Sequence, residues 1–265
     1  MMSLLPKEHG AYGQLTFPLL TSFAVAGVSV PSALIACAVV AAFLAHEPLL
    51  ILLGGRGPRA KREDGRRARM WLAVAVAVVI VVGAGVAALA SRASGVRGWL
   101  LLPLVPAVFV AAAVISRREK SALGEIAVAL TFSLIAVPIC VASGAPPDTA
   151  LAVGVAFAII FVAATLSVRA IVLKVRAGGN ARASSSTRAA LWTFAVASTA
   201  GLVTSALRGI LPWTVLLAVA PGLVAAMWLT SFPPPPARLR TVGWTLIAIS
   251  TAATLILIGG LSGNR

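Results

Sequence analysis

Long apolar runs separated by short polar stretches follow one another along nearly the whole chain. Nine of these runs are long enough to cross a bilayer as helices of about 20 residues, and the shortest would cross with modest tilt or local thinning. They are Gln14 to Val30, Ser32 to Leu53, Met70 to Ala90, Trp99 to Ile115, Ala122 to Val141, Thr149 to Leu173, Ala189 to Leu207, Ile210 to Leu229 and Val242 to Leu261. The pattern predicts an all-α polytopic membrane protein with about nine transmembrane helices, built as a single transmembrane domain over residues 1–265.

The composition agrees with this class of protein. Hydrophobic residues make up 60% of the chain and charged residues 11%, and the mean hydropathy is +1.01. A soluble domain would carry about 25% charged residues. The composition therefore excludes a soluble globular protein.

The second apolar run carries ionisable side chains in its body. His46 and Glu47 precede Leu53, the last apolar residue of the run, by seven and six positions, which on a helix is about 10 Å below the hydrocarbon edge. Pro48 follows directly and frees the carbonyl of Leu44, so we expect a kink or a break there. Ionisable residues inside a membrane usually face a cavity or a partner. Two interpretations stay open: a functional site, or a Glu47 that only pairs with a nearby Arg or Lys and fixes helix packing.

Basic residues are distributed unevenly between alternate connections of the predicted helices. One side holds 18 of the 22 Lys and Arg residues, with the densest group from Arg56 to Arg69, and the other side holds the remaining four. Since cytosolic loops are enriched in Lys and Arg, we predict a cytosolic N-terminus and a C-terminus on the opposite side. The net charge of +15 is then mainly a topology signal. With no basic soluble domain to carry such a site, we expect no nucleic-acid partner.

The stretch from Pro6 to Tyr12, PKEHGAY, places an acid, a base and an imidazole at the cytosolic mouth of the first helix. Glu8 could simply complement the helix dipole, whereas His9 is harder to explain as a cap. The first two predicted helices are joined by a very short turn, so they should be antiparallel neighbours with these ends level. We therefore expect Glu8 and His9 to share one site with His46 and Glu47.

Three short motifs stand out in the first two runs: KEHGA at residues 7–11, FPLL at residues 17–20 and HEPL at residues 46–49. With them the chain resembles the YwiC-like family of bacterial integral membrane proteins. The family has a tryptophan at the position of Tyr12, which leaves an aromatic residue there. The resemblance implies a multi-pass protein of the bacterial inner (plasma) membrane, and it implies no particular activity.

Two further ionisable residues lie in predicted helices on the cytosolic side. Glu125 lies one turn into the fifth helix, where Ser121 can cap the helix and the carboxylate favours its N-terminal dipole. Arg169 lies four residues before Leu173, the end of the sixth run, and can either reach the cytosolic surface or point inward. If it points inward, it is the natural partner of Glu47 or of an anionic ligand. We predict that Arg169 and Glu47 face one cavity.

The predicted loop from Gly54 to Arg69 is basic and opens with a glycine-rich turn that would let Arg56 approach an anion. Lys61 lies in the same loop, and Arg117 and Arg176 lie in later cytosolic connections. These four residues are candidates for binding the anionic group of a ligand or cofactor. The alternative is retention of the loop on the inside and contact with anionic lipid headgroups. The sequence identifies no cofactor. His9 and His46 could ligate one metal with Glu8 or Glu47 if the first two helices meet there, but two histidines without fixed spacing are a weak metal signal.

The layout of nine helices, with large cytosolic loops after the second and sixth, also resembles the UbiA-type intramembrane prenyltransferases. The resemblance implies a UbiA-like bundle. In those enzymes the two loops carry aspartate-rich motifs that hold Mg²⁺ against a diphosphate, and neither loop of this chain carries such a motif. Because magnesium bound to a diphosphate needs several clustered carboxylates, the resemblance extends to layout and not to activity.

Three functions remain open at this point. The first is an intramembrane enzyme or binding protein with a cytosol-facing polar cavity for an amphipathic or phosphorylated lipid-like molecule. The second is a small proton-coupled transporter, and the third is a non-catalytic membrane partner protein. The candidate site residues for the first are Glu8, His9, His46, Glu47, Glu125 and Arg169. Membrane lipids are the expected partners in each case.

Overall fold

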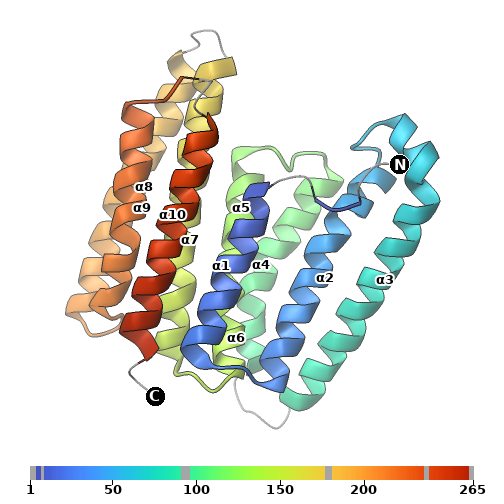
Figure 1. Cartoon of the computed structure of the whole chain (residues 1–265), viewed down its shortest axis with the longest axis horizontal. Coiled ribbons are helices and arrows are strands. Elements are labelled where there is room, and N and C mark those ends of the chain that lie inside the picture. Colours follow the sequence, from blue (N-terminus) through green and yellow to red (C-terminus); the bar gives the residue numbers. More distant parts are fainter. Residues whose placement is uncertain (1–3, 7–8, 91–95, 177–180, 236–238, 263–265) are drawn as a thin grey trace.

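The computed structural model describes residues 4–6, 9–90, 96–176, 181–235 and 239–262, and within them it contains ten α-helices and no strand. The helices are α1 (His9–Ala26), α2 (Val30–Leu52), α3 (Pro58–Ala90), α4 (Val96–Ile115), α5 (Ala122–Leu134), α6 (Ala136–Ala142), α7 (Pro147–Arg176), α8 (Ala181–Leu207), α9 (Trp213–Ser231) and α10 (Leu239–Leu261). They run side by side, with α2 and α3 at one flank, α7 to α10 at the other, and α1, α4, α5 and α6 between them (Figure 1). The helices therefore form a bundle in which their axes are roughly aligned.

Eight segments are long and apolar enough to cross a membrane, and they correspond to every predicted run except the first. The all-helical, multi-span membrane fold is thus confirmed. Helix α1 lies inside the bundle, but polar residues interrupt its apolar sequence. Thr21 and Ser22 are fully buried there. The hydroxyl of Thr21 lies 3.2 Å from that of Thr254 in α10, and the hydroxyl of Ser22 donates to the carbonyl of Pro18 at 2.7 Å.

The fifth predicted helix is divided in two. Helix α5 ends at Leu134 and α6 begins at Ala136. Pro138 has no amide to donate to the carbonyl of Leu134, and its ring crowds that carbonyl, so the hydrogen-bond ladder is interrupted there. The two helices together still form one candidate span, residues 122–142.

The structure differs from the expectation at two prolines. Helix α3 begins at Pro58, so the predicted loop from Gly54 to Arg69 is a short turn followed by helix. Proline is favoured at the first helical position because its missing amide has no partner there in any case. Helix α2, in contrast, continues through Pro48 to Leu52, and the break considered for that position is absent.

Helix α7 lies at the centre of the packing, in contact with helices on both sides of the bundle. Phe157 is completely buried in it, and Ile160 and Phe161 are nearly so. These side chains belong to the main apolar core, which also includes residues of α5, α6, α8, α9 and α10. The core therefore lies away from the α2–α3 flank.

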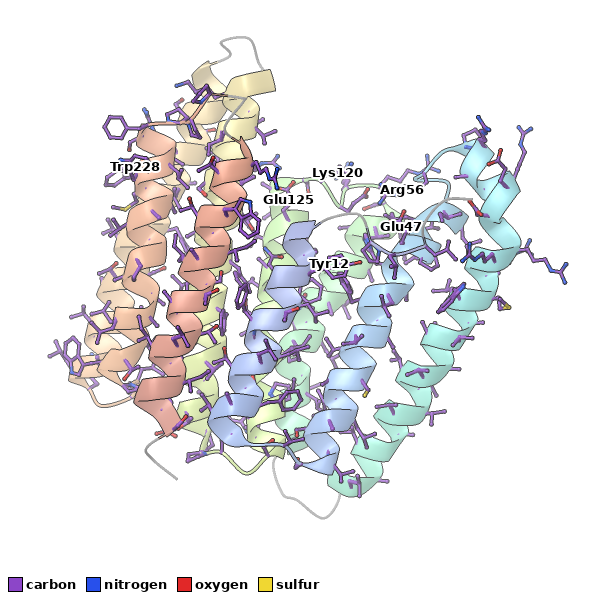
Figure 2. All side chains as sticks on the ribbon, in the orientation of Figure 1. Tyr12, Glu47, Arg56, Lys120, Glu125 and Trp228 are labelled. Carbon is purple, nitrogen blue, oxygen red and sulfur yellow. The ribbon has the colours of Figure 1, made fainter. Side chains whose placement is uncertain are left out.

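The two ends of the bundle differ in charge. Arg56, Arg117 and Lys120 lie in connections at one end, which we call the basic end, and Figure 2 labels two of them there. The turn after α1 and the turn after α6 lie at the opposite end, which we call the far end (Figure 1).

At the far end these two turns are joined by reciprocal hydrogen bonds. The Ser29 hydroxyl donates to the carbonyl of Ala142 at 2.7 Å, and the Ser143 hydroxyl donates to the carbonyl of Gly27 at 2.9 Å. Ser29 also caps α2 through a capping box with Ser32. We call this arrangement the far-end clasp.

Candidate functional site

A cavity of about 560 Å³ lies among α2, α3, α4, α5 and α6. Its walls are formed largely by apolar side chains, and the ionisable side chains in its lining are His46, Glu47 and Arg56 at the basic end. Along α2 the lining extends from Glu47 down to Ile35, which is about 18 Å at the helical rise of roughly 1.5 Å per residue. The cavity is thus a long apolar slot with a charged end.

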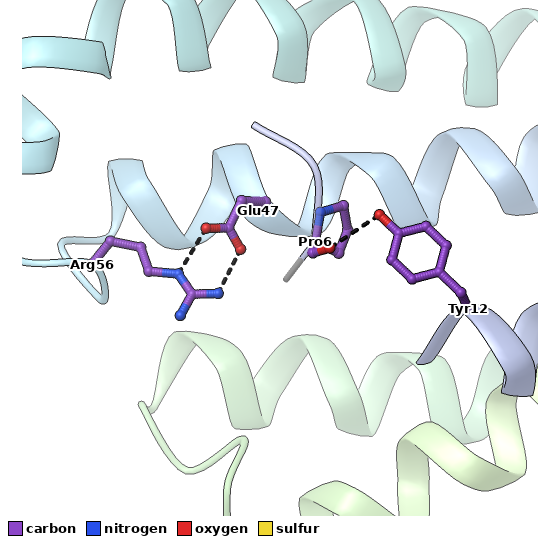
Figure 3. Close-up of polar contacts among 4 residues, drawn as sticks. All are labelled: Pro6, Tyr12, Glu47 and Arg56. Carbon is purple, nitrogen blue, oxygen red and sulfur yellow. Dashed lines mark hydrogen bonds and ion pairs between the residues drawn. The ribbon is translucent and has the colours of Figure 1, made fainter. Parts of the chain in front are cut away.

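A bidentate ion pair forms the charged end. Arg56 Nε donates to Glu47 Oε1 at 2.8 Å, and the terminal nitrogen Nη2 donates to Oε2 at 2.6 Å (Figure 3). The Glu47 side chain is 1% exposed and that of Arg56 is 22% exposed. Two parallel bonds between a guanidinium and a carboxylate are a strong, directional arrangement. The predicted alternative that a nearby Arg or Lys pairs with Glu47 is therefore confirmed as far as the pairing goes, and the partner is Arg56.

The turn after α2 explains how a residue nine positions away reaches Glu47. Gly54 has φ +78°, its amide donates to the carbonyl of Ile51, and the amide of Gly55 donates to that of Leu50. This is a Schellman motif, whose left-handed position favours glycine. The motif turns the chain back on α2, and Arg56 then lies over the last turns of the helix.

Arg117 contributes a second guanidinium at the same place. It is the one non-glycine residue with positive φ (56°) among those described, and it lies two residues beyond Ile115, where α4 ends. Its Nη2 donates to the carbonyl of Leu53, the last turn of α2, at 3.1 Å. Cations stabilise helix C-termini because the terminal carbonyls lack partners within the helix. The end of α2 is thus bound by two guanidiniums, Arg56 at Glu47 and Arg117 at the carbonyl of Leu53.

The N-terminal segment covers the cavity next to this pair. Pro6 is buried and lines the cavity, and its carbonyl accepts a hydrogen bond from the Tyr12 hydroxyl at 3.0 Å (Figure 3). The Tyr12 ring meets Phe43 edge to face at a centroid distance of 5.0 Å, and Phe43 meets Phe132 in the same way at 5.7 Å. These three rings connect α1, α2 and α5 across the top of the cavity.

The predicted pair of Glu47 with Arg169 is wrong. The Nη1 atom of Arg169 instead donates to Glu125 Oε2 at 3.0 Å and to the carbonyl of Lys120 at 3.2 Å. Ser121 caps α5 as expected, and this places Glu125 in the first turn, facing α7. Neither Glu125 nor Arg169 lines the cavity. A similar predicted depth in the bilayer therefore did not identify the ion-pair partners. Glu47 pairs with Arg56, and Glu125 pairs with Arg169.

The remaining candidates are placed as follows. His46 lines the cavity and is half-buried, and Lys61 is exposed on α3. Glu8 lies outside the described residues, as do the side chains of His9 and Arg176. The expected site shared by His9 and His46 therefore stays a prediction.

The helices that carry these histidines are antiparallel, but α1 packs against α10 and α6 rather than along α2. They approach each other at the basic end through Tyr12 and Phe43. A second, apolar groove of about 500 Å³ lies between them, lined by residues such as Leu19 and Val40. The turn between α1 and α2 is short, as predicted, yet it does not bring the two helices into full contact.

Sequence reasoning missed the apolar part of the site. Gly83 of α3, Leu104 of α4 and Phe132 of α5 all line the cavity, but they lie within apolar stretches of the sequence and no motif marks them. The glycines around Arg56 indicate a guanidinium approaching an anion and so identified the charged end, whereas the apolar lining has no comparable local signal. In the structure that anion is Glu47. Within the described residues, no three His, Cys, Asp or Glu side chains are grouped so that they could hold a metal ion.

Comparison with known proteins identifies the part of the chain that contains this site. A family model described as YwiC-like protein matches residues 5–140. The match covers just over half of the chain, and all the residues that line the cavity, from Pro6 to Pro138, lie inside it. No curated protein and no solved structure matches the chain, so the UbiA-like layout stays a prediction. The segment that matches the family is the segment that surrounds the cavity.

Proposed function

Since this chain belongs to the YwiC-like family and is a multi-span helical membrane protein, we propose that it binds an anionic, lipid-like amphiphile. The apolar chain of the ligand occupies the slot among α2 to α6. Its head group lies at the basic end, beside Glu47 and Arg56. In this proposal the protein is in the bacterial inner membrane with the basic end in the cytosol, as the distribution of Lys and Arg indicates.

The observation that carries the proposal is the buried Glu47–Arg56 pair at the end of an apolar cavity. Removing two charges from water is costly, and apolar side chains would stabilise such a position as well or better. An arginine fork held in this way matches the geometry of phosphate and carboxylate groups.

The dimensions of the cavity favour an amphiphile over a compact metabolite. The slot is about 18 Å deep, slightly more than half of the roughly 30 Å hydrocarbon core of a bilayer. A head group at Arg56 would therefore place its chain at the depth that lipid chains of one leaflet occupy. The basic end also carries Arg117 and Lys120, so charge complementarity favours an anionic head.

Proton-coupled transport is the second candidate, and the length of the slot favours it. His46 lines the cavity, and an imidazole there could act as a proton shuttle. Transport would also require the slot to open at the far end, where the far-end clasp joins the two turns. Net movement of the amphiphile between leaflets of a proteoliposome would favour transport, and binding without movement would favour the first candidate.

The binding proposal is tested with hexadecyl phosphate, using the purified protein in lipid nanodiscs. Hexadecanol, which lacks the anionic head, and inorganic phosphate, which lacks the chain, are the matched ligands. We expect hexadecyl phosphate to bind more tightly than either by at least about tenfold, or about 1.4 kcal/mol. Equal affinity for hexadecyl phosphate and hexadecanol would contradict a role for the charged end.

A paired substitution locates the head group. The variant Glu47→Gln with Arg56→Gln removes both charges together and leaves no unpaired ion, so it should fold but lose most of the preference for the anionic head. The control is Glu125→Gln with Arg169→Gln, which neutralises a pair outside the cavity. That control should bind hexadecyl phosphate as the unchanged protein does.

A further inference from the structure

We propose that the ligand enters and leaves the cavity sideways, through an opening between α3 and α4 that faces the bilayer. This inference rests on the proposed function and adds the route of access and the physical state of the ligand. A ligand that enters sideways is delivered from the lipid phase and need never be dissolved in water. A water-soluble metabolite would instead enter at the basic end.

The helices around the cavity do not all pack closely against one another. Helix α3 packs along α2, whereas it meets α4 at very few positions. The cavity is lined by Gly83 on the α3 side of this separation and by Leu104 on the α4 side. Both residues are exposed, and the exposed fraction of Leu104 is 52%. The wall between α3 and α4 is therefore a side on which the lining of the cavity reaches the surface.

The surface around this opening is hydrocarbon-like. Both helices are candidate membrane spans, over residues 58–86 and 98–115. Ile80 and Val81 on α3 are 64% and 70% exposed, and Val105 and Val108 on α4 are 73% and 68% exposed. In a membrane these side chains contact lipid chains, so a lipid chain can pass from the bilayer into the slot without crossing a polar surface.

The basic end is closed by ordered contacts. Glu47 is completely buried beneath Arg56, and Pro6 is buried over the neighbouring part of the cavity. The Tyr12 hydroxyl holds the carbonyl of Pro6, and its ring packs against Phe43. A ligand arriving from water would have to displace both the ion pair and this cover (Figure 3).

Gly83 provides the position at which the opening can be blocked. A Cβ atom built on Gly83 would have no atom of another residue within 4 Å, so a side chain there would project into free space. Gly201 of α8 is likewise exposed, without a neighbour within 4 Å, and it lies far from the cavity lining. The two glycines form a matched pair for the same large substitution.

The test is the rate of exchange of hexadecyl phosphate between nanodisc lipid and protein, measured by stopped-flow with a fluorescent derivative. Gly83→Trp and Leu104→Trp should each slow both association and dissociation by about tenfold or more, with Kd nearly unchanged, because a gate changes rates in both directions. Gly201→Trp should exchange at the rate of the unchanged protein. Leu104→Trp tests the same opening from the opposite wall if Gly83→Trp does not fold.

Three results would count against lateral access while leaving the proposed function intact. One is exchange at the unchanged rate in both gate variants. Another is faster exchange in Tyr12→Phe, which releases Pro6 and would open the aqueous route. A higher Kd without slower dissociation in Gly83→Trp would mean that the indole fills the slot, and it would also count against a gate. Absence of any hexadecyl phosphate binding by the unchanged protein would instead overturn the proposed function, and this inference with it.

Discussion

The guanidinium of Arg56 binds both carboxylate oxygens of Glu47 from nine positions further along the chain, at 2.8 and 2.6 Å. Residues on one helix face meet at separations of three or four, so this pair cannot form on a continuous helix surface. It depends on the Schellman turn at Gly54. The charged end of the cavity is therefore built within a single segment, the end of α2 and the turn that follows it.

The first prediction concerns the stability of this pair. Arg56→Ala leaves a carboxylate that is 1% exposed without its cation, and this should cost on the order of 3 kcal/mol. Glu47→Gln keeps one acceptor for Arg56 and should cost less, about 1–2 kcal/mol. The double variant Glu47→Gln with Arg56→Gln should cost less than the sum of Glu47→Gln and Arg56→Gln measured singly, because the two residues are in contact. Unfolding in a mild detergent, followed by circular dichroism, measures these differences.

The same experiment separates the observed pairing from the one expected at first. Glu47→Gln combined with Arg169→Gln should be additive, because each residue has a different partner. A coupling energy above about 0.5 kcal/mol between Glu47 and Arg169 would show that they meet after all.

The second prediction concerns the pair of Glu125 and Arg169. Their side chains are 37% and 25% exposed, and partly exposed ion pairs contribute at most about 1 kcal/mol. Glu125→Gln should therefore lower stability only slightly. Arg169→Ala should lower it more, since Arg169 also donates to the carbonyl of Lys120. Equal losses from the two changes would mean that the bond to Lys120 contributes nothing measurable.

The third prediction concerns the cover over the cavity. Tyr12→Phe removes the hydroxyl that donates to Pro6 and keeps the ring against Phe43, so it should cost about 1 kcal/mol. The peptide before α1 should then be cut faster by a protease in limited proteolysis. Thr199→Val, which removes a local hydroxyl bond in α8, is the control and should leave the cutting rate unchanged.

The fourth prediction uses two glycines with opposite requirements. Gly54 has φ +78°, and Gly54→Ala should cost about 1 kcal/mol because a Cβ is disfavoured in that conformation. Gly65 lies within α3 and has no neighbour within 4 Å of an added Cβ. Gly65→Ala should stabilise the protein by about 0.5–1 kcal/mol. Gly54→Ala should also weaken hexadecyl phosphate binding, and a loss of stability with unchanged binding would mean that the turn does not position Arg56 for the ligand.

The fifth prediction concerns orientation. Lys61 is exposed at the basic end and Arg208 is exposed in the connection between α8 and α9 at the far end. In a Cys37→Ser background, Lys61→Cys should resist a membrane-impermeant thiol reagent in intact cells, and Arg208→Cys should react with it. The reverse labelling pattern would place the basic end outside.

Much of the architecture follows from the sequence because hydrocarbon thickness fixes the length of a spanning helix. Each of the nine apolar runs forms helix in the described residues, with the fifth run interrupted by Pro138. The boundaries were less accurate where polar residues continue a helix beyond the membrane. The residues from Pro58 to Arg69 are helical for this reason, although their charge favoured a loop.

The site was only partly predictable. His46, Glu47 and Arg56 could be identified because charge in an apolar run and glycine around an arginine are visible in the sequence. Their partners could not be read from depth alone: Glu47 and Arg169 have similar predicted depths, but the path of the chain after α2 brings Arg56 closer. The separation of α3 from α4 depends on how the ten helices pack together, and no local sequence pattern at Gly83 or Leu104 predicts it.

The far-end clasp has a consequence for how the bundle can move. Helices α1 and α2 are fastened there through Gly27 and Ser29 to the end of α6, while at the other end they meet through the rings of Tyr12 and Phe43. Helix α2 is also held at the basic end, where Arg117 binds the carbonyl of Leu53. The far-end clasp and this bond together fasten α2 at both ends, so the helix cannot swing about Ser29 unless the bond to Arg117 breaks.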